Sequence, residues 1–132
     1  MPFYLLDTCA WFDYHLNPEI LSGKTQSVIC SQKFFHLSSI SLMEVCRKNA
    51  AGHLELSMPL ADWMKMATVP DLFHLLDISV PIAIDAFALP GNFHKDPADR
   101  LIVATARVHQ LTIITSDKKI LDYPHVRTLK SR

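Results

Sequence analysis

Short apolar runs alternate with helix-like segments along this chain, and this alternation restricts its fold more than any other feature. Strand-like runs are expected at residues 3–6, 36–40, 75–79, 111–115 and 126–129. Helices are expected from residue 18 towards 32 and over 42–51, 59–67, 81–89 and 97–110, several of them with Pro or Gly at an end. Strands alternating with helices indicate an α/β fold whose parallel sheet is covered on both faces.

Length and composition favour one folded domain spanning residues 1–132. A chain of 132 residues, of which 49% are hydrophobic, can bury a core without disulfides. The formal net charge is zero, which argues against a protein that coats nucleic acid by phosphate neutralisation alone. Only three glycines occur, so neither a P-loop nor a Gly-rich dinucleotide loop can be built.

Three widely spaced cysteines, Cys9, Cys30 and Cys46, form no C-x-x-C pair and are expected to be free, mostly buried thiols. The first residues lack the basic start of a signal peptide, and no apolar run reaches the ~20 residues needed to cross a bilayer. We therefore expect a cytoplasmic location and no membrane partner.

Acidic residues follow the predicted strands at several points. Asp7 comes directly after the first strand, and Glu44 is expected in the first turn of the helix that follows residues 36–40. Asp96 and Asp99 open the helix that starts at residue 97, and Asp117 follows the strand at 111–115. Because the carboxyl ends of parallel strands share one edge of a sheet, where ligands bind, these carboxylates should lie close together.

Carboxylates gathered at one edge repel one another unless a cation or protons compensate their charge. Hard oxygen ligands select Mg²⁺ or Mn²⁺ rather than zinc. A metal held in this way near nucleic acid suggests hydrolysis of a phosphodiester bond.

Each acidic residue also has a purely structural interpretation. Ser41 and Glu44 fit a capping box, and Asp96 before Pro97 fits a helix cap. Asp99 would favour the helix dipole, and Asp117 could begin a turn. Asp7 is harder to explain structurally, since a carboxylate that ends a buried strand is costly without a partner.

Four segments together resemble one known family, the PIN-domain ribonucleases, and within it the VapC-type toxins of toxin–antitoxin pairs. They are LLDTCAWF, ISLMEVCRK, HKDPADRLIVATA and TIITSDKKILDYPHVRTL. The resemblance runs from Tyr4 to about Leu129 with the motifs in family order, and the combination of DPADRLIVATA with TSDKKI is its most specific part.

The resemblance implies a three-layer α/β/α sandwich on a parallel sheet and an endoribonuclease site that uses Mg²⁺ or Mn²⁺. It also implies an RNA substrate, a cognate antitoxin, a homodimer, and toxin–antitoxin hetero-oligomers. Carried over by position, the metal-binding and catalytic quartet is Asp7, Glu44, Asp99 and Asp117. Thr115 matches the hydroxyl residue of the family's T-x-D arrangement, and Asp96 is treated as accessory.

Other functional classes fit less well. A receiver domain needs an acidic pair after its first strand, and this chain has one Asp there. Haloacid dehalogenase-like phosphatases need D-x-D, whereas Cys9 stands two residues beyond Asp7. A noncatalytic PIN-like module that binds protein or RNA remains the alternative; its mark would be a broken acidic set, which is absent here.

Residues around the motifs are less specific. Trp11, Phe12 and Tyr14 are expected in the core rather than in a groove for an antitoxin helix, and His94 and His125 as packing or surface residues. Basic side chains beside the motifs could guide phosphate or simply be solvated: Arg47, Lys48, Lys95, Arg100, Lys118 and Lys119.

Overall fold

The computed structural model describes residues 3–132 and has a five-stranded sheet in the order β3-β2-β1-β4-β5. Every neighbouring pair of strands is parallel. The strands are β1 (Tyr4–Leu6), β2 (Phe35–Ser38), β3 (Phe73–Leu76), β4 (Thr112–Thr115) and β5 (Arg127–Lys130). The central strand β1 therefore lies between β2 and β4, the two strands that precede predicted acidic motifs.

One face of the sheet is covered by α1 (Thr8–Leu16), α3 (Ser39–Ala50) and α4 (Leu60–Ala67). Leu6 and Ile114 point to this face, where they pack with Trp11 of α1 and Trp63 of α4. The indole of Trp11 donates a hydrogen bond of 2.9 Å to the Ala67 carbonyl, which ties α1 to the end of α4. The prediction that Trp11 belongs to the core is confirmed.

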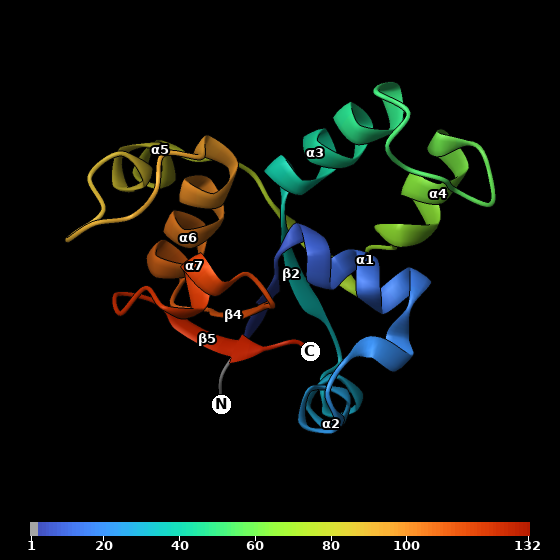
Figure 1. Cartoon of the computed structure of the whole chain (residues 1–132), viewed down its shortest axis with the longest axis horizontal. Helices are drawn as coiled ribbons and strands as arrows, with labels where there is room; N and C mark the ends of the chain where they lie inside the picture. Colours follow the sequence, from blue (N-terminus) through green and yellow to red (C-terminus); the bar gives the residue numbers. More distant parts are fainter. Residues whose placement is uncertain (1–2) are drawn as a thin grey trace.

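The opposite face carries α6 (Pro97–His109) and the short α7 (Lys118–Leu121). Leu5 and Ile113 point to this face, as expected from the alternation of side chains along a strand, and pack against Ile102 and Ile120. The helix α5 (Val80–Ala86) packs outside the sheet against α6 (Figure 1). Helices thus cover both faces of a parallel sheet, which confirms the predicted α/β/α sandwich.

Two helices differ from the sequence expectation. The sequence pattern predicts no element over residues 8–16, yet this segment forms α1, because Asp7 accepts a hydrogen bond from the Ala10 amide and caps the helix. The helix expected from residue 18 towards 32 is divided into a 3₁₀ turn, η1 (Pro18–Ile20), and α2 (Gly23–Ser31). Ser22 caps α2 through the Thr25 amide, and this second start signal explains the division.

The predicted first-turn position of Glu44 is wrong. The strand β2 ends at Ser38 instead of residue 40, and Ser38 caps α3 by accepting a hydrogen bond from the Ile40 amide. Glu44 therefore lies in the second turn of α3, and Ser41 is not part of a capping box. The strand expected at 75–79 is likewise displaced, to Phe73–Leu76.

No helix within residues 3–132 is long and apolar enough to cross a membrane.

Candidate active site

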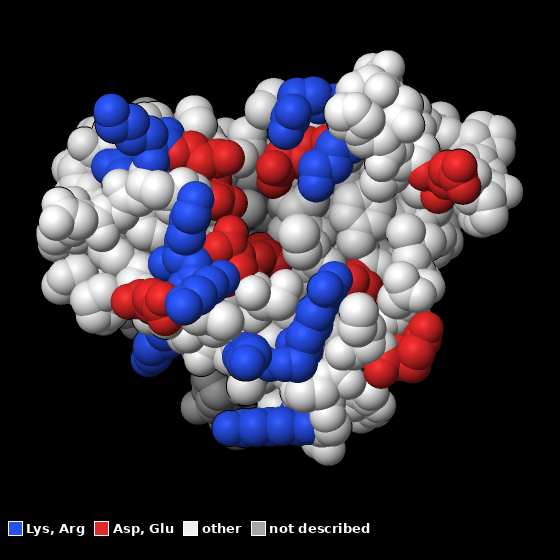
Figure 2. Space-filling model, viewed as in Figure 1, with Lys and Arg blue, Asp and Glu red and all other residues white. Residues whose placement is uncertain are grey.

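The predicted acidic residues reach the carboxyl edge of the sheet from different elements. Asp7 follows β1, Asp117 lies two residues beyond β4, and Glu44 comes from α3, which follows β2. Asp99 is in the first turn of α6, whose far end leads into β4, so this turn lies at the same edge. Figure 2 shows acidic side chains gathered in a hollow between α5–α7 and α3–α4, with basic side chains around it.

Asp7 is the most deeply buried member, with 4% of its surface exposed. Its backbone amide donates to the Ile114 carbonyl of β4, and its carboxylate accepts from the Ala10 amide at 2.8 Å and from the Thr115 hydroxyl. Thr115 also accepts a hydrogen bond of 2.9 Å from the Asp117 amide. One buried hydroxyl therefore links the Asp7 carboxylate to the backbone of Asp117.

Glu44 is oriented by a second hydroxyl. Thr8, the first residue of α1, donates a hydrogen bond of 2.5 Å to Oε1 of Glu44. The same hydroxyl lies 2.8 Å from the hydroxyl of Ser41, one helical turn before Glu44. Thr8 and Ser41 are both buried, so these contacts join α1 to α3 next to Asp7.

Asp96 and Asp99, at the start of α6, make different contacts. Asp96 caps the helix by accepting from the amides of Ala98 (2.9 Å) and Asp99 (3.2 Å), as predicted. Asp99 makes a different contact: its Oδ2 lies 3.0 Å from Nε2 of His94. The capping role of Asp96 leaves the Asp99 carboxylate available to face the acidic hollow.

Asp117 also caps a helix, since its carboxylate accepts a hydrogen bond of 2.8 Å from the Lys119 amide at the start of α7. The structural alternative considered for Asp117, the start of a turn, is replaced by the N-cap of a short helix. The carboxylate keeps further acceptor capacity, because an ionised carboxylate has about four lone-pair sites.

The electrostatics show that the carboxylates act on one another. Burial raises the pKa of Asp7 to about 6, the Thr115 and Ala10 hydrogen bonds oppose this, and the charges of Asp117 and Asp99 raise it further. Burial also raises the pKa of Asp99 to about 6; further contributions come from Asp96, Asp117 and Glu44, which raise it, and from His94, which lowers it. Carboxyls from four separate parts of the chain therefore share one electrostatic environment.

Within residues 3–132, no three His, Cys, Asp or Glu side chains lie close enough together, as they are positioned here, to hold a metal ion. The donor chemistry nevertheless suits a hard cation. Two of the carboxyls have a pKa near 6, raised first by burial and then by neighbouring carboxylates. A divalent cation that prefers oxygen ligands would reduce the repulsion between these carboxylates. Metal ligation by the quartet stays a prediction.

Two arginines near the motifs have structural roles. Arg100 donates to the carbonyls of Ala86, Phe93 and His94, so it holds the segment before α6. Arg132 pairs with the buried Asp13 through contacts of 3.0 and 3.1 Å.

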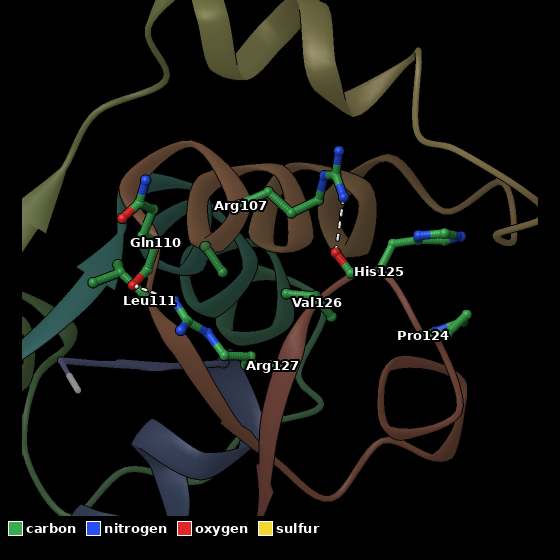
Figure 3. A pocket seen from close by; sticks show the side chains of 8 residues that line it. Arg107, Gln110, Leu111, Pro124, His125, Val126 and Arg127 are labelled. Carbon is green, nitrogen blue, oxygen red and sulfur yellow. Dashed lines mark hydrogen bonds between the residues drawn. The ribbon is translucent and has the colours of Figure 1, made fainter. Parts of the chain in front are cut away.

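A separate hollow of about 390 Å³ lies where α6 ends and β5 begins (Figure 3). Its two guanidinium groups are already engaged. Arg107 pairs with Asp85 and donates to the His125 carbonyl, and Arg127 donates to the Gln110 carbonyl. The hollow contains none of the predicted site residues, and its arginines hold the chain together.

Sequence reasoning missed Thr8, Ser41 and His94 as members of the site. Thr8 and Ser41 are 33 residues apart, and only the packing of α1 against α3 brings their hydroxyls together. His94 had a local signal, because it precedes the Asp96 cap by two residues in HKDPAD. That spacing could have suggested a contact with the first turn of α6.

Comparison with known proteins decides the family. A model described as "PIN domain" matches residues 4–126. The chain belongs to the PIN-domain family. A curated relative, "Ribonuclease VapC22" from Mycobacterium tuberculosis, is 28% identical over 123 residues, covering 93% of each chain. The family predicted from the four motifs is confirmed.

Solved structures agree with this PIN fold. VapBC2 from Rickettsia felis, bound to a promoter DNA fragment, matches with a TM-score of 0.71 and 16% identity, covering 98% of this chain and 99% of that one. FitAcB from Neisseria gonorrhoeae matches with a TM-score of 0.70 and 21% identity, covering 97% of each chain. A toxin–antitoxin complex from Klebsiella pneumoniae matches with a TM-score of 0.67 and 23% identity, covering 96% of each.

The raised pKa of Asp7 predicts that Asp7→Asn stabilises the metal-free protein. Its pKa is about 6 in the folded chain against an ordinary value of 3.8, so the folded state retains the proton more strongly. Stability is therefore lost as the pH rises through this interval, by up to about 3 kcal/mol at pH 7. Urea unfolding in EDTA should show a gain of about 1–3 kcal/mol for Asp7→Asn at pH 7, which vanishes below about pH 4.

Asp13→Asn is the matched control, because Asp13 is also buried but is paired with Arg132. This variant should show no gain in the free energy of unfolding at pH 7. A loss of stability in Asp7→Asn equal to that in Asp13→Asn would contradict the electrostatic account of Asp7.

Proposed function

We propose that this PIN-domain protein is a metal-dependent endoribonuclease that hydrolyses RNA phosphodiester bonds. The observation that carries the proposal is the common electrostatic environment of Asp7, Asp99, Asp117 and Glu44 at the carboxyl edge of the sheet. The name of the curated relative, a ribonuclease, supports RNA as the substrate.

The quartet Asp7, Glu44, Asp99 and Asp117 would hold Mg²⁺ or Mn²⁺, since carboxylate oxygens are the ligands these ions prefer. When bound, such an ion activates water and neutralises charge on the phosphate. The four proposed ligands are all carboxylates, which favours a hard ion over zinc at this edge of the sheet.

The chain's own residues set the positions of these groups. Thr115 holds the Asp7 carboxylate, and Thr8 holds Glu44. A hydrogen bond to a metal-binding carboxylate fixes its orientation and tunes its affinity for the metal. His94 contacts Asp99 and reduces the unfavourable charge around it. Basic residues beside the hollow, among them Lys118 and Lys119 at the start of α7, would attract the RNA backbone towards the carboxylates.

We further propose that the protein is the toxin of a toxin–antitoxin pair, inhibits translation by cutting RNA in the cytoplasm, and is held inactive by a cognate antitoxin. The solved structures of similar fold include toxin–antitoxin complexes, which supports an antitoxin partner. On and beside α5, the side chains of Val80, Ile84 and Phe87 are 65–73% exposed. Apolar side chains grouped on a surface commonly mark a protein–protein contact, which supports a homodimer.

Cleavage of total RNA tests the enzymatic proposal. Wild-type protein with Mg²⁺ or Mn²⁺ should produce discrete fragments, and EDTA should abolish them. Asp7→Asn and Asp99→Asn should each reduce cleavage by about 100-fold or more, because each removes a charged ligand while keeping the side-chain shape. Sequencing the new RNA ends would identify the substrate. Equal cleavage by all samples, with or without EDTA, would reject the proposal.

Three further variants separate positioning from general damage. Thr8→Val removes the hydroxyl that holds Glu44 and should lower both Mn²⁺ affinity and cleavage about tenfold or more, whereas Thr8→Ser should restore them. Thr105→Val is the matched control, since Thr105 is equally buried but bonds only the Leu101 carbonyl within α6. Its Mn²⁺ affinity should equal that of the wild type.

Sedimentation tests the proposed partners. The protein alone should sediment as a dimer at micromolar concentration, and Ile84→Lys on α5 should shift it to a monomer. Co-expression with the product of the neighbouring reading frame should give a larger complex that does not cleave RNA. A wild-type monomer, or a neighbouring product that neither binds nor inhibits, would count against the assembly.

A further inference from the structure

A pair of histidines lies on the sheet away from the acidic hollow. His36 of β2 and His74 of β3 are directly paired in the parallel register, so both side chains point to the same face. Their ring centroids are 5.8 Å apart with an interplanar angle of 78°. Each is the second residue of its strand, so the pair lies nearer the amino edge, opposite the edge that carries the carboxylates.

Aromatic neighbours restrict the orientation of both imidazoles. Phe34 stacks on His74 with a centroid distance of 4.1 Å and an angle of 13°. The same phenyl ring meets His36 edge to face at 5.5 Å, and Phe3 meets His36 at 6.3 Å. Rings held in this way lose little side-chain entropy when they bind a shared ligand.

His36 has an unsatisfied nitrogen. Its Nδ1 is buried and has no hydrogen-bond partner, which costs free energy in an imidazole. Burial lowers the pKa of His36, and the nearby His74 and His109 lower it further, so the neutral ring is favoured. A neutral imidazole has a lone pair that can bind a metal ion.

We propose that His36 and His74 form a two-imidazole binding site for a borderline divalent transition-metal ion such as Ni²⁺ or Zn²⁺. With metal–nitrogen bonds of about 2.0–2.1 Å and a tetrahedral angle, the two ring centroids would lie roughly 5 Å apart. The observed 5.8 Å is less than 1 Å from that value, a gap that small side-chain rotations close. Imidazole is a ligand that suits zinc, copper and nickel.

The site differs in chemistry from the acidic hollow. Mg²⁺ requires oxygen ligands and does not compete for imidazole nitrogen. No third His, Cys, Asp or Glu of residues 3–132 approaches closely enough to complete a three-residue site, so water supplies the remaining positions. With only two protein ligands, the site would exchange its metal ion with solution more readily than a structural zinc site, which has four protein ligands.

Calorimetric titration with Ni²⁺ in excess Mg²⁺ tests the proposal, because Mg²⁺ competes for oxygen ligands and not for imidazole nitrogen. The wild type should bind one equivalent of Ni²⁺. His36→Gln and His74→Gln should each weaken binding about tenfold or more, and the double variant should remove it. His74 is exposed, so His74→Gln should fold normally, which circular dichroism checks independently.

His53→Gln is the control, since His53 is exposed on the turn after α3 and should not change Ni²⁺ affinity. The prediction that the thiols of Cys9, Cys30 and Cys46 are mostly buried is wrong, since all three are exposed. Their alkylation should likewise leave the Ni²⁺ affinity unchanged. Absence of Ni²⁺ binding by the wild type, or equal binding by the double variant, would overturn the proposal.

Discussion

The burial of one carboxylate at the end of the central strand is the constraint on which the rest of the site depends. Asp7 ends β1 between β2 and β4, is almost fully enclosed, and caps α1. A charge in that position is unfavourable unless other groups compensate it. Thr115 and the Ala10 amide satisfy its oxygens, but burial still raises the pKa to about 6. The fold thus holds the Asp7 carboxyl where its charged form is disfavoured, and a nearby positive charge would stabilise that form.

Hydroxyl groups orient two of the four carboxylates in this acidic cluster. Thr115 joins Asp7 to Asp117, and Thr8 joins α1 to Glu44. A hydroxyl can orient a carboxylate without neutralising it, so the negative potential of the hollow is retained. Arginines instead pair outside the cluster, as Arg132 does with Asp13, or hold backbone carbonyls, as Arg100 does. None of these arginines therefore neutralises the four carboxylates directly.

The sequence predicted a structural feature best where that feature depends on adjacent residues alone. Asp96 before Pro97 predicted a helix cap, and the structure has it, because N-capping depends only on adjacent residues. Glu44 was placed one turn too early, since Ser38 and Ser41 are equally plausible caps until packing selects Ser38. Thr8 and His94 were missed as site residues because their roles depend on contacts made by the folded chain. The parallel sheet was predictable from the alternation of elements, and the family from the order of the acidic motifs.

The most direct test of the central claim, that this edge of the sheet holds a divalent cation, is anomalous diffraction from crystals of the wild-type protein grown with Mn²⁺. The account predicts an anomalous peak bounded by carboxylate oxygens of Asp7, Glu44, Asp99 and Asp117, and its loss in Asp7→Asn crystals. A Mn²⁺ peak bound elsewhere, with no density among these four carboxylates, would contradict it.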